Sequence, residues 1–268
     1  AHGSLYMVGA FACAVTAAAT GSFWLGLAAS LAAAAAAGAL VEILVIRRLY
    51  ERDHLDQVLA TFALILIFSE GTRWMFGSFP LYLDIPPLLQ GTVSLPGGSR
   101  YQLYRLAIIG VGIAVAVALF LLISKTRLGM RIRAGESDRE MIGALGVDIR
   151  TLYTVVFALG AALAGLAGAM VGALQSVQVG MGEPVLILAF VVIVIGGIGS
   201  IKGALIGAVI VGVTDTMGRF LLPQLFGLVM PPSQAGLVGG ALASMLIYIV
   251  MAAVLAVRPQ GLFPAAKG

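Results

Sequence analysis

Residues 191–212 read VVIVIGGIGSIKGALIGAVIVG, and this stretch decides the fold class. It could be a phosphate-binding loop between a strand and a helix, or two membrane segments that meet at a glycine hinge. Gly197, Gly199 and Gly203 give the spacing G-x-G-x-x-x-G, whereas a dinucleotide site needs G-x-G-x-x-G. Lys202 is followed by glycine rather than by the Ser or Thr of a P-loop. The stretch therefore predicts two apolar segments joined at a hinge.

The composition of the chain supports the membrane interpretation. Hydrophobic residues make up 60% of the 268 residues, charged residues only 10%, and the mean hydropathy is +1.07. Soluble domains carry about 25% charged residues, so we expect lipid to be the main solvent of this protein. The single cysteine, Cys13, excludes a disulfide within the chain. His2 and His54 lie too far apart to suggest a metal site, and we expect no metal and no other cofactor.

The apolar segments are long enough to cross a bilayer, which takes about 20 residues. They predict an all-α, polytopic integral membrane bundle that forms one transmembrane domain over residues 1–268. Two pairs, the first two segments and the two around the hinge, have very short connections. Each pair is either two crossings or a crossing with a re-entrant element buried in protein. The eight segments are 4–20, 22–46, 56–76, 104–123, 152–174, 184–199, 203–222 and 237–257.

The positive charges predict the orientation of the chain, because Lys and Arg stay on the cytoplasmic side. When the segments alternate across the membrane, twelve of the 16 Lys and Arg residues fall on one side. This bias requires two full crossings around the glycine hinge. It places the carboxyl terminus in the cytoplasm.

Small residues recur every fourth position in two of the segments, as in 160–172 and 199–207. Such ridges let helix backbones approach closely in lipid. We interpret them as packing faces. The sequence does not decide whether the hinge moves during transport or only lets the helices pack. The candidate hinge and packing residues are Gly160, Gly168, Gly196, Gly197, Gly199, Gly203 and Gly207.

Ionisable residues within the segments do not predict chemistry. Glu70 and Arg73, and likewise Asp215 and Arg219, are spaced to lie on one helix face and predict surface ion pairs. Glu42 lies close in sequence to Arg47 and Arg48. The segments contain no series of acids that would serve as a proton relay, which weakens a proton-coupled carrier. They also contain no nucleophile with a base, so we expect a protein that is not an enzyme.

Residues 124–151 form the longest charged stretch, and they mix basic and acidic side chains. The pattern predicts a short helix over Glu136–Leu145 that ends at Gly146, since glycine is a favoured helix carboxyl cap. A helix exposed between two membrane segments is suited to docking a cytoplasmic partner.

Several motifs resemble one known family. The sequence EMIGALG at Glu140–Gly146 keeps the Glu and Gly spacing of the loop by which ABC importer permeases engage their ATPases. The Ala-Ala after the Glu and the later Leu-Pro of that loop are absent. AHGSL at 1–5, GGIGS at 196–200 and RPQGLF at 258–263 extend the match over nearly the whole chain. The chain resembles the permease subunits of bacterial branched-chain amino acid ABC transporters, of the LivH type. Members normally have a further hydrophobic segment before AHGSL, which suggests that this sequence is amino-terminally truncated.

The resemblance implies a permease that translocates branched-chain amino acids across the bacterial inner membrane without hydrolysing ATP itself. The implied partners are a second permease of the LivM type, two cytoplasmic ATP-binding subunits and a periplasmic substrate-binding protein; no nucleic acid is expected. The ATPases would dock on Glu136, Arg139, Glu140 and Gly146. The substrate-binding residues stay unassigned. Urea, short amides or other amino acids are alternative cargoes, and a stand-alone channel or secondary carrier is the alternative class.

Overall fold

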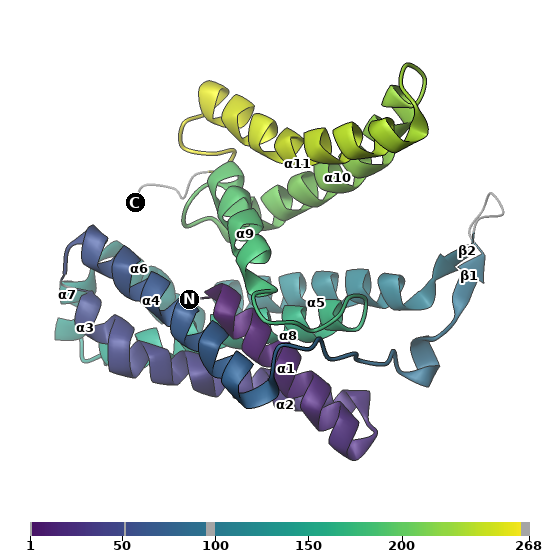
Figure 1. Cartoon of the computed structure of the whole chain (residues 1–268). Coiled ribbons are helices and arrows are strands. Elements are labelled where there is room, and N and C mark those ends of the chain that lie inside the picture. The colour runs from purple at the N-terminus through teal and green to yellow at the C-terminus, as the bar shows by residue number, and fades with distance from the viewer. Residues whose placement is uncertain (1, 51, 95–99, 264–268) are drawn as a thin grey trace. The chain divides into compact units, whose positions relative to one another are not determined.

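The computed structural model describes residues 2–50, 52–94 and 100–263 (Figure 1). The chain divides into two compact units, residues 1–183 and 184–268. The expectation of a single transmembrane domain stays a prediction.

Within the described residues, the first unit is mainly helical and contains a two-stranded hairpin. Its amino-terminal part consists of α1 (His2–Thr20), α2 (Phe23–Val41), the π-helical turn η1 (Glu42–Ile46), α3 (Arg47–Leu49) and α4 (His54–Phe76). The connection that follows holds the 3-10 turn η2 (Pro87–Leu89) and the strands β1 (Thr92–Ser94) and β2 (Arg100–Gln102). Its last helices are α5 (Leu103–Lys125), α6 (Arg127–Ser137), α7 (Arg139–Ala144) and α8 (Ile149–Gly172).

The second unit contains α10 (Ile201–Phe226) and α11 (Pro232–Val257), which form an antiparallel hairpin (Figure 1). The helix α9 (Gly182–Gly196) leads into it. Val191 and Ile195 of α9 form a buried apolar cluster with Val211 of α10 and Ile247 of α11. This cluster fixes the three helices of the unit against one another.

The polytopic helical architecture predicted from the sequence is confirmed. Within the described residues, seven helices are long and apolar enough to cross a membrane. The eighth apolar helix, α9, has only 15 residues. At 1.5 Å per residue it spans about 22 Å, less than the roughly 30 Å of a bilayer core. Two full crossings around the hinge therefore stay a prediction.

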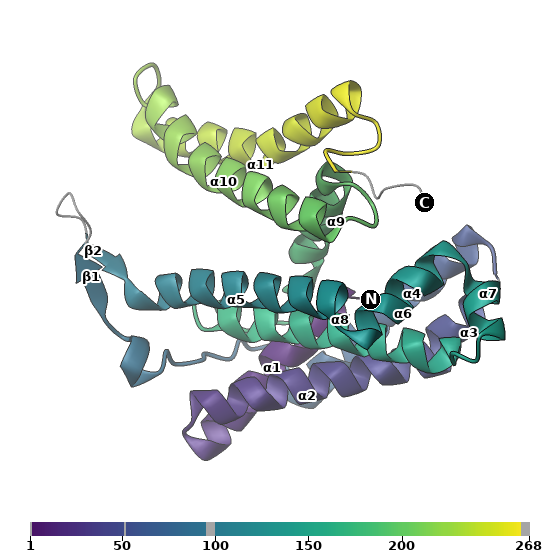
Figure 2. The same cartoon turned by 180° about the vertical axis from the view of Figure 1, so that it is seen from behind.

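The core of the first unit is a close packing of α1, α2 and α8, which lie side by side in both views (Figures 1 and 2). Gly165 of α8 meets the backbone of Gly9 in α1 and the side chain of Ala34 in α2, with no room for a Cβ atom. The hydroxyl of Ser30 in α2 donates a 2.9 Å hydrogen bond to the Gly165 carbonyl. Small residues thus allow backbone contact where lipid supplies no hydrophobic drive between helices.

The connection between α4 and α5 is ordered where it is described. Leu81 and Val177 exchange two backbone hydrogen bonds of 2.8 Å, so this connection pairs with the segment after α8. β1 and β2 form an antiparallel pair in which Val93 is opposite Tyr101. The Tyr104 hydroxyl then donates a 2.8 Å bond to the Met170 carbonyl of α8. These bonds hold both ends of the connection against the helical core.

Candidate functional site

The charged stretch 124–151 folds as two short helices rather than one. The helix predicted over Glu136–Leu145 is divided at Asp138, so Glu136 lies in the last turn of α6 while Glu140 lies in the first turn of α7. Asp138 has extended backbone angles, and its carboxylate accepts a 2.9 Å hydrogen bond from the Met141 N–H. An aspartate that caps a new helix in this way competes with continuation of the old one. We call α6, α7 and their connection to α8 the docking loop, after the role that the sequence predicts for this stretch.

The carboxyl end of α7 is a Schellman motif. Gly146 has a φ of +85°, its N–H bonds to the Gly143 carbonyl at 3.0 Å, and the Val147 N–H bonds to the Ile142 carbonyl at 3.3 Å. The left-handed conformation at Gly146 is strained for residues with a Cβ atom. Gly146 thus ends α7 and turns the chain towards α8 within two residues.

One face of α7 is exposed, and Ile142 on the other face is buried. The exposed side chains are those of Glu140, Met141 and Leu145. The side chains of Glu136 and Arg139 lie outside the described residues, although their backbones belong to α6 and α7. The docking loop therefore presents an acid beside two large apolar side chains, a combination suited to a protein partner.

Asp148 joins the docking loop to α8. Its carboxylate caps the helix by accepting bonds from the Thr151 hydroxyl at 2.6 Å and from the Arg150 N–H at 2.9 Å. The hydrogen bonds from Thr151, followed by those from Arg150, hold the pKa of Asp148 below its ordinary value of 3.8. Bonds to the charged form favour ionisation, so this cap is a carboxylate at neutral pH.

This cap predicts a small pH dependence of stability. Because the folded-state pKa is lowered, the charged cap stabilises the fold above about pH 4, and that contribution is lost as the pH falls through the folded-state pKa. We expect Asp148→Ala to lower the unfolding midpoint in detergent at pH 7, and expect the difference from wild type to shrink below pH 3.8. Asp148→Asn, which caps without titrating, is the control. An Ala variant whose midpoint differs from wild type equally at both pH values would contradict this assignment.

The glycine hinge lies between α9 and α10 and is packed by backbone on several sides. Gly196 and Gly203 meet each other's backbone, and a Cβ atom on Gly207 would lie 2.6 Å from the Val192 carbonyl. Gly197 and Gly199 have positive φ angles of +102° and +82°. The turn therefore needs glycine for two reasons, close approach and left-handed backbone.

The carboxyl-terminal segment 258–263 is bound to this hinge, which the sequence did not reveal. The N–H groups of Leu262 and Phe263 donate to the carbonyls of Ile195 and Gly196 at 2.9 and 3.0 Å. They satisfy carbonyl groups at the end of α9 that have no partner within the helix. A Cβ atom on Gly261 would lie 2.5 Å from the Gly197 Cα. The motifs GGIGS at 196–200 and RPQGLF at 258–263, some sixty residues apart, are thus hydrogen-bonded and packed against each other.

The glycines predicted as a packing ridge on α8 have unequal surroundings. Gly168 lies against the Tyr6 carbonyl of α1, and a Cβ atom there would overlap it. A Cβ atom on Gly160 would meet only the His2 side chain, at 3.4 Å. Gly165, which lies against the backbone of both α1 and α2, is not among the candidate packing residues predicted from the sequence. The i+4 spacing marks a face but does not indicate which of its members touches a partner.

A family comparison identifies the chain. The family model of the branched-chain amino acid transport system permease component matches residues 1–255. The chain belongs to this family. It is 30% identical over 234 residues to the high-affinity branched-chain amino acid transport system permease protein BraD of Pseudomonas aeruginosa. The aligned region covers 81% of this chain and 75% of BraD. The resemblance stated from the sequence motifs is thereby confirmed.

Two further relatives carry the name LivH. A probable branched-chain amino acid transport permease protein LivH of Methanocaldococcus jannaschii is 31% identical over 144 residues, 54% of this chain and 43% of that protein. The high-affinity LivH permease protein of Salmonella typhimurium is 27% identical over 236 residues, 83% of this chain and 76% of that protein. No solved structure matches the chain. The relatives are transport permease subunits, so this permease is a transport protein rather than an enzyme.

Two of the polar features predicted from the sequence are ion pairs within single helices. The predicted pairs Glu70–Arg73 and Asp215–Arg219 form, each at 2.8 Å. Both arginine side chains are more than half exposed, with 51% and 58% of their surface accessible. Among the described residues, no group of His, Cys, Asp and Glu could hold a metal ion.

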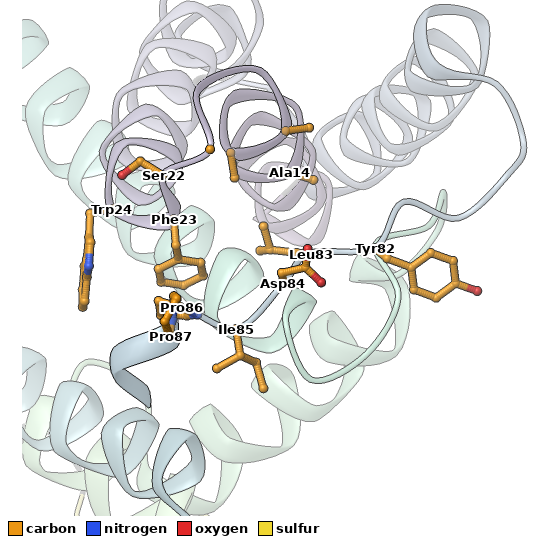
Figure 3. Close-up of a pocket in the computed structure, with 13 residues that line it drawn as sticks. Ala14, Ser22, Phe23, Trp24, Tyr82, Leu83, Asp84, Ile85, Pro86 and Pro87 are labelled. Atoms are coloured by element: carbon orange, nitrogen blue, oxygen red, sulfur yellow. The ribbon is translucent and has the colours of Figure 1, made fainter. Parts of the chain in front are cut away.

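The permease has a shallow pocket of about 300 Å³ between the α1–α2 turn and the segment 82–87 (Figure 3). Phe23, Pro86 and Pro87 line its apolar side, and Trp24, Tyr82 and Asp84 supply exposed polar or aromatic groups (Figure 3). Aromatic residues of this kind gather where a membrane protein meets the lipid headgroups. The pocket contains one carboxylate and no basic side chain, so it does not offer both of the charges that would hold a zwitterionic amino acid.

Proposed function

We propose that this permease is the membrane-spanning subunit of an ABC importer that carries branched-chain amino acids across the bacterial inner membrane. The names of its relatives support this cargo. The proposed assembly contains a second permease of the LivM type, two cytoplasmic ATP-binding subunits and a periplasmic substrate-binding protein. The positive charges of the sequence support a cytoplasmic docking loop and carboxyl terminus.

The observation that carries the proposal is the architecture of the docking loop. α6 and α7 lie between two membrane-spanning helices, and α7 exposes Glu140, Met141 and Leu145 while Ile142 anchors it. An exposed helix of this kind can receive a partner and pass its movement to α8 through Asp148. Glu136, Arg139, Glu140 and Gly146 are the proposed docking residues, and Gly146 acts by shaping the loop.

The direct test is uptake by the reconstituted assembly. We would place the full-length permease with its candidate partners in vesicles and measure leucine uptake with and without ATP, and then repeat it with urea and a short amide. Leucine uptake that depends on ATP supports the proposal. Preferred uptake of urea or the amide would keep the importer but change its cargo. Gradient-driven uptake without the ATPases would overturn the importer in favour of a channel or carrier.

The docking assignment predicts the effect of a charge reversal at Glu140. Glu140 is exposed, so Glu140→Lys should leave folding intact, but it would place a cation where the partner meets an acid. We expect leucine uptake per ATP hydrolysed to fall by about tenfold or more, since like-charge contacts across an interface cost several kcal/mol and about 1.4 kcal/mol already corresponds to tenfold.

The matched control is Asp56→Lys, because Asp56 is also an exposed acid near the amino end of a helix but lies outside the docking loop. We expect Asp56→Lys to transport as wild type does. Normal transport by Glu140→Lys, or an equal loss in both variants, would remove Glu140 from the docking surface.

A further inference from the structure

A buried carboxylate lies at the end of α2 nearest the docking loop. Glu42 is fully buried, and Arg47 donates to its two oxygens from Nε at 3.3 Å and Nη2 at 3.0 Å. The Thr154 hydroxyl, from α8, donates to the Glu42 Oε2 at 2.7 Å and accepts from the Arg47 Nη2 at 2.7 Å. The Arg150 carbonyl of the same helix is a longer alternative acceptor for this hydroxyl, at 3.0 Å. We call these three residues the α2–α8 joint. The carboxylate is satisfied from its own helix and from a helix 112 residues away.

The ion pair of the joint depends on the π-helical turn η1. Glu42 and Arg47 are five residues apart, and on an α-helix that spacing turns side chains about 140° away from each other. In the structure the Arg47 N–H bonds to the Glu42 carbonyl, the i→i+5 pattern of a π-helix, which brings both side chains to one face. The π turn and the ion pair therefore support each other. Short π segments in helices are frequent at functional positions.

The same turns of α8 that hold Thr154 also contact the docking loop. Asp148 caps α8 six residues before Thr154, and a Cβ atom on Gly135 of α6 would lie 3.5 Å from the Leu152 side chain. Next to Thr154, the Tyr153 ring packs on Tyr50 beyond α3, with centroids 5.2 Å apart. The first two turns of α8 are thus bonded to the docking loop on one side and to the end of α2 on the other.

We propose that the α2–α8 joint makes the end of α2 and the start of α8 move as one body, so that displacement of the docking loop reaches α2. This inference rests on the proposed docking of ATPases on α6 and α7. In this proposal Glu42, Arg47 and Thr154 are positioning residues, because their role is to hold two helices together. Their side chains set the distance between two membrane helices that are otherwise in contact through small residues.

The test replaces Thr154 by valine, which keeps the shape of the side chain and removes its hydroxyl. We expect ATP hydrolysis by the assembly to stay within about twofold of wild type, while leucine uptake per ATP falls by about tenfold, the effect of losing a charge-assisted hydrogen bond. Thr154→Ser, which keeps the hydroxyl, should restore coupling. The matched control is Thr61→Val, because the Thr61 hydroxyl bonds only within its own helix, to the Val58 carbonyl at 2.9 Å.

A second measurement tests the joint without transport. Spin labels at Leu44 of η1 and Val155 of α8, both exposed, report the separation of the two helices by electron paramagnetic resonance. We expect one narrow distance in wild type that does not change when ATP is added, and a broadened distance in Thr154→Val. Should Thr154→Val fail to fold, Arg47→Lys takes its place, because it keeps the charge and loses the two-point contact with Glu42.

The outcomes separate this inference from the proposed function. Absence of ATP-driven uptake in wild type overturns the proposed function, and the spin-label distance then tests the joint alone. Wild-type coupling in Thr154→Val, an equal loss in Thr61→Val, or a distance in wild type that changes with ATP would each overturn the joint. Reduced coupling together with a broadened distance, both reversed by serine, supports it.

Discussion

Replacing Gly168 by valine is expected to separate α1 from α8 and to destabilise the first unit by about 3 kcal/mol, near the upper end of typical overpacking effects. A Cβ atom at Gly168 would overlap the Tyr6 carbonyl and lie 3.4 Å from the Ala10 N atom. Both obstacles are backbone atoms of α1, so no side-chain rotation can relieve them. Thermal unfolding of the permease in detergent measures the loss.

The matched control is Gly110→Val, because Gly110 also lies within a membrane-spanning helix, α5, and a Cβ atom there meets nothing within 4 Å. We expect its unfolding temperature to stay close to that of wild type. Similar unfolding temperatures for the two variants would show that α1 and α8 are not in the close contact described above.

Replacing Gly197 by alanine is expected to release the carboxyl-terminal segment from the hinge. Gly197 has a φ of +102°, and a Cβ atom would lie 2.8 Å from the Phe263 carbonyl and 3.1 Å from the Gln260 carbonyl. The left-handed backbone alone costs about 1–2 kcal/mol, and the crowding adds to that cost. We expect faster hydrogen exchange at the Leu262 and Phe263 amides, since these groups would lose their bonds to α9.

Gly77→Ala isolates the backbone contribution, because Gly77 has a φ of +83° but open space around it. We expect this control to leave hydrogen exchange in the carboxyl-terminal segment unchanged. Gly197→Ala with wild-type exchange at Leu262 and Phe263 would show that the two motifs are not interdependent.

The spanning helices could be predicted because they depend on local composition. A run of about 20 apolar residues has to become a helix in lipid, since each backbone polar group needs a partner within its own segment. The boundaries of α1, α4 and α5 accordingly lie within a few residues of the apolar runs. The ion pairs at Glu70 and Asp215 were predictable for the same reason, because both partners lie within one helical turn or so.

The break between α6 and α7 at Asp138 could have been predicted from the sequence, but one continuous helix was predicted instead. Asp138 precedes a helical pattern and is a favoured cap residue, yet the acidic and basic residues around it also suit one continuous helix. The structure decides for two helices because the Asp138 carboxylate bonds the Met141 N–H. The hydrogen bond from the Met141 N–H to the Asp138 carboxylate outweighs the small gain in helix propensity that one continuous helix would have.

The sequence by itself determined that this permease is a helical membrane protein of a transport family, because apolar run length and short motifs are local properties of the chain. The tertiary structure alone decided which distant groups meet. It placed Thr154 on Glu42, Leu262 on the α9 carboxyl end and Gly165 between α1 and α2. Such pairings follow from how whole helices pack and from the unusual π spacing at Glu42, and neither the i+4 ridges nor the charge pattern specifies them.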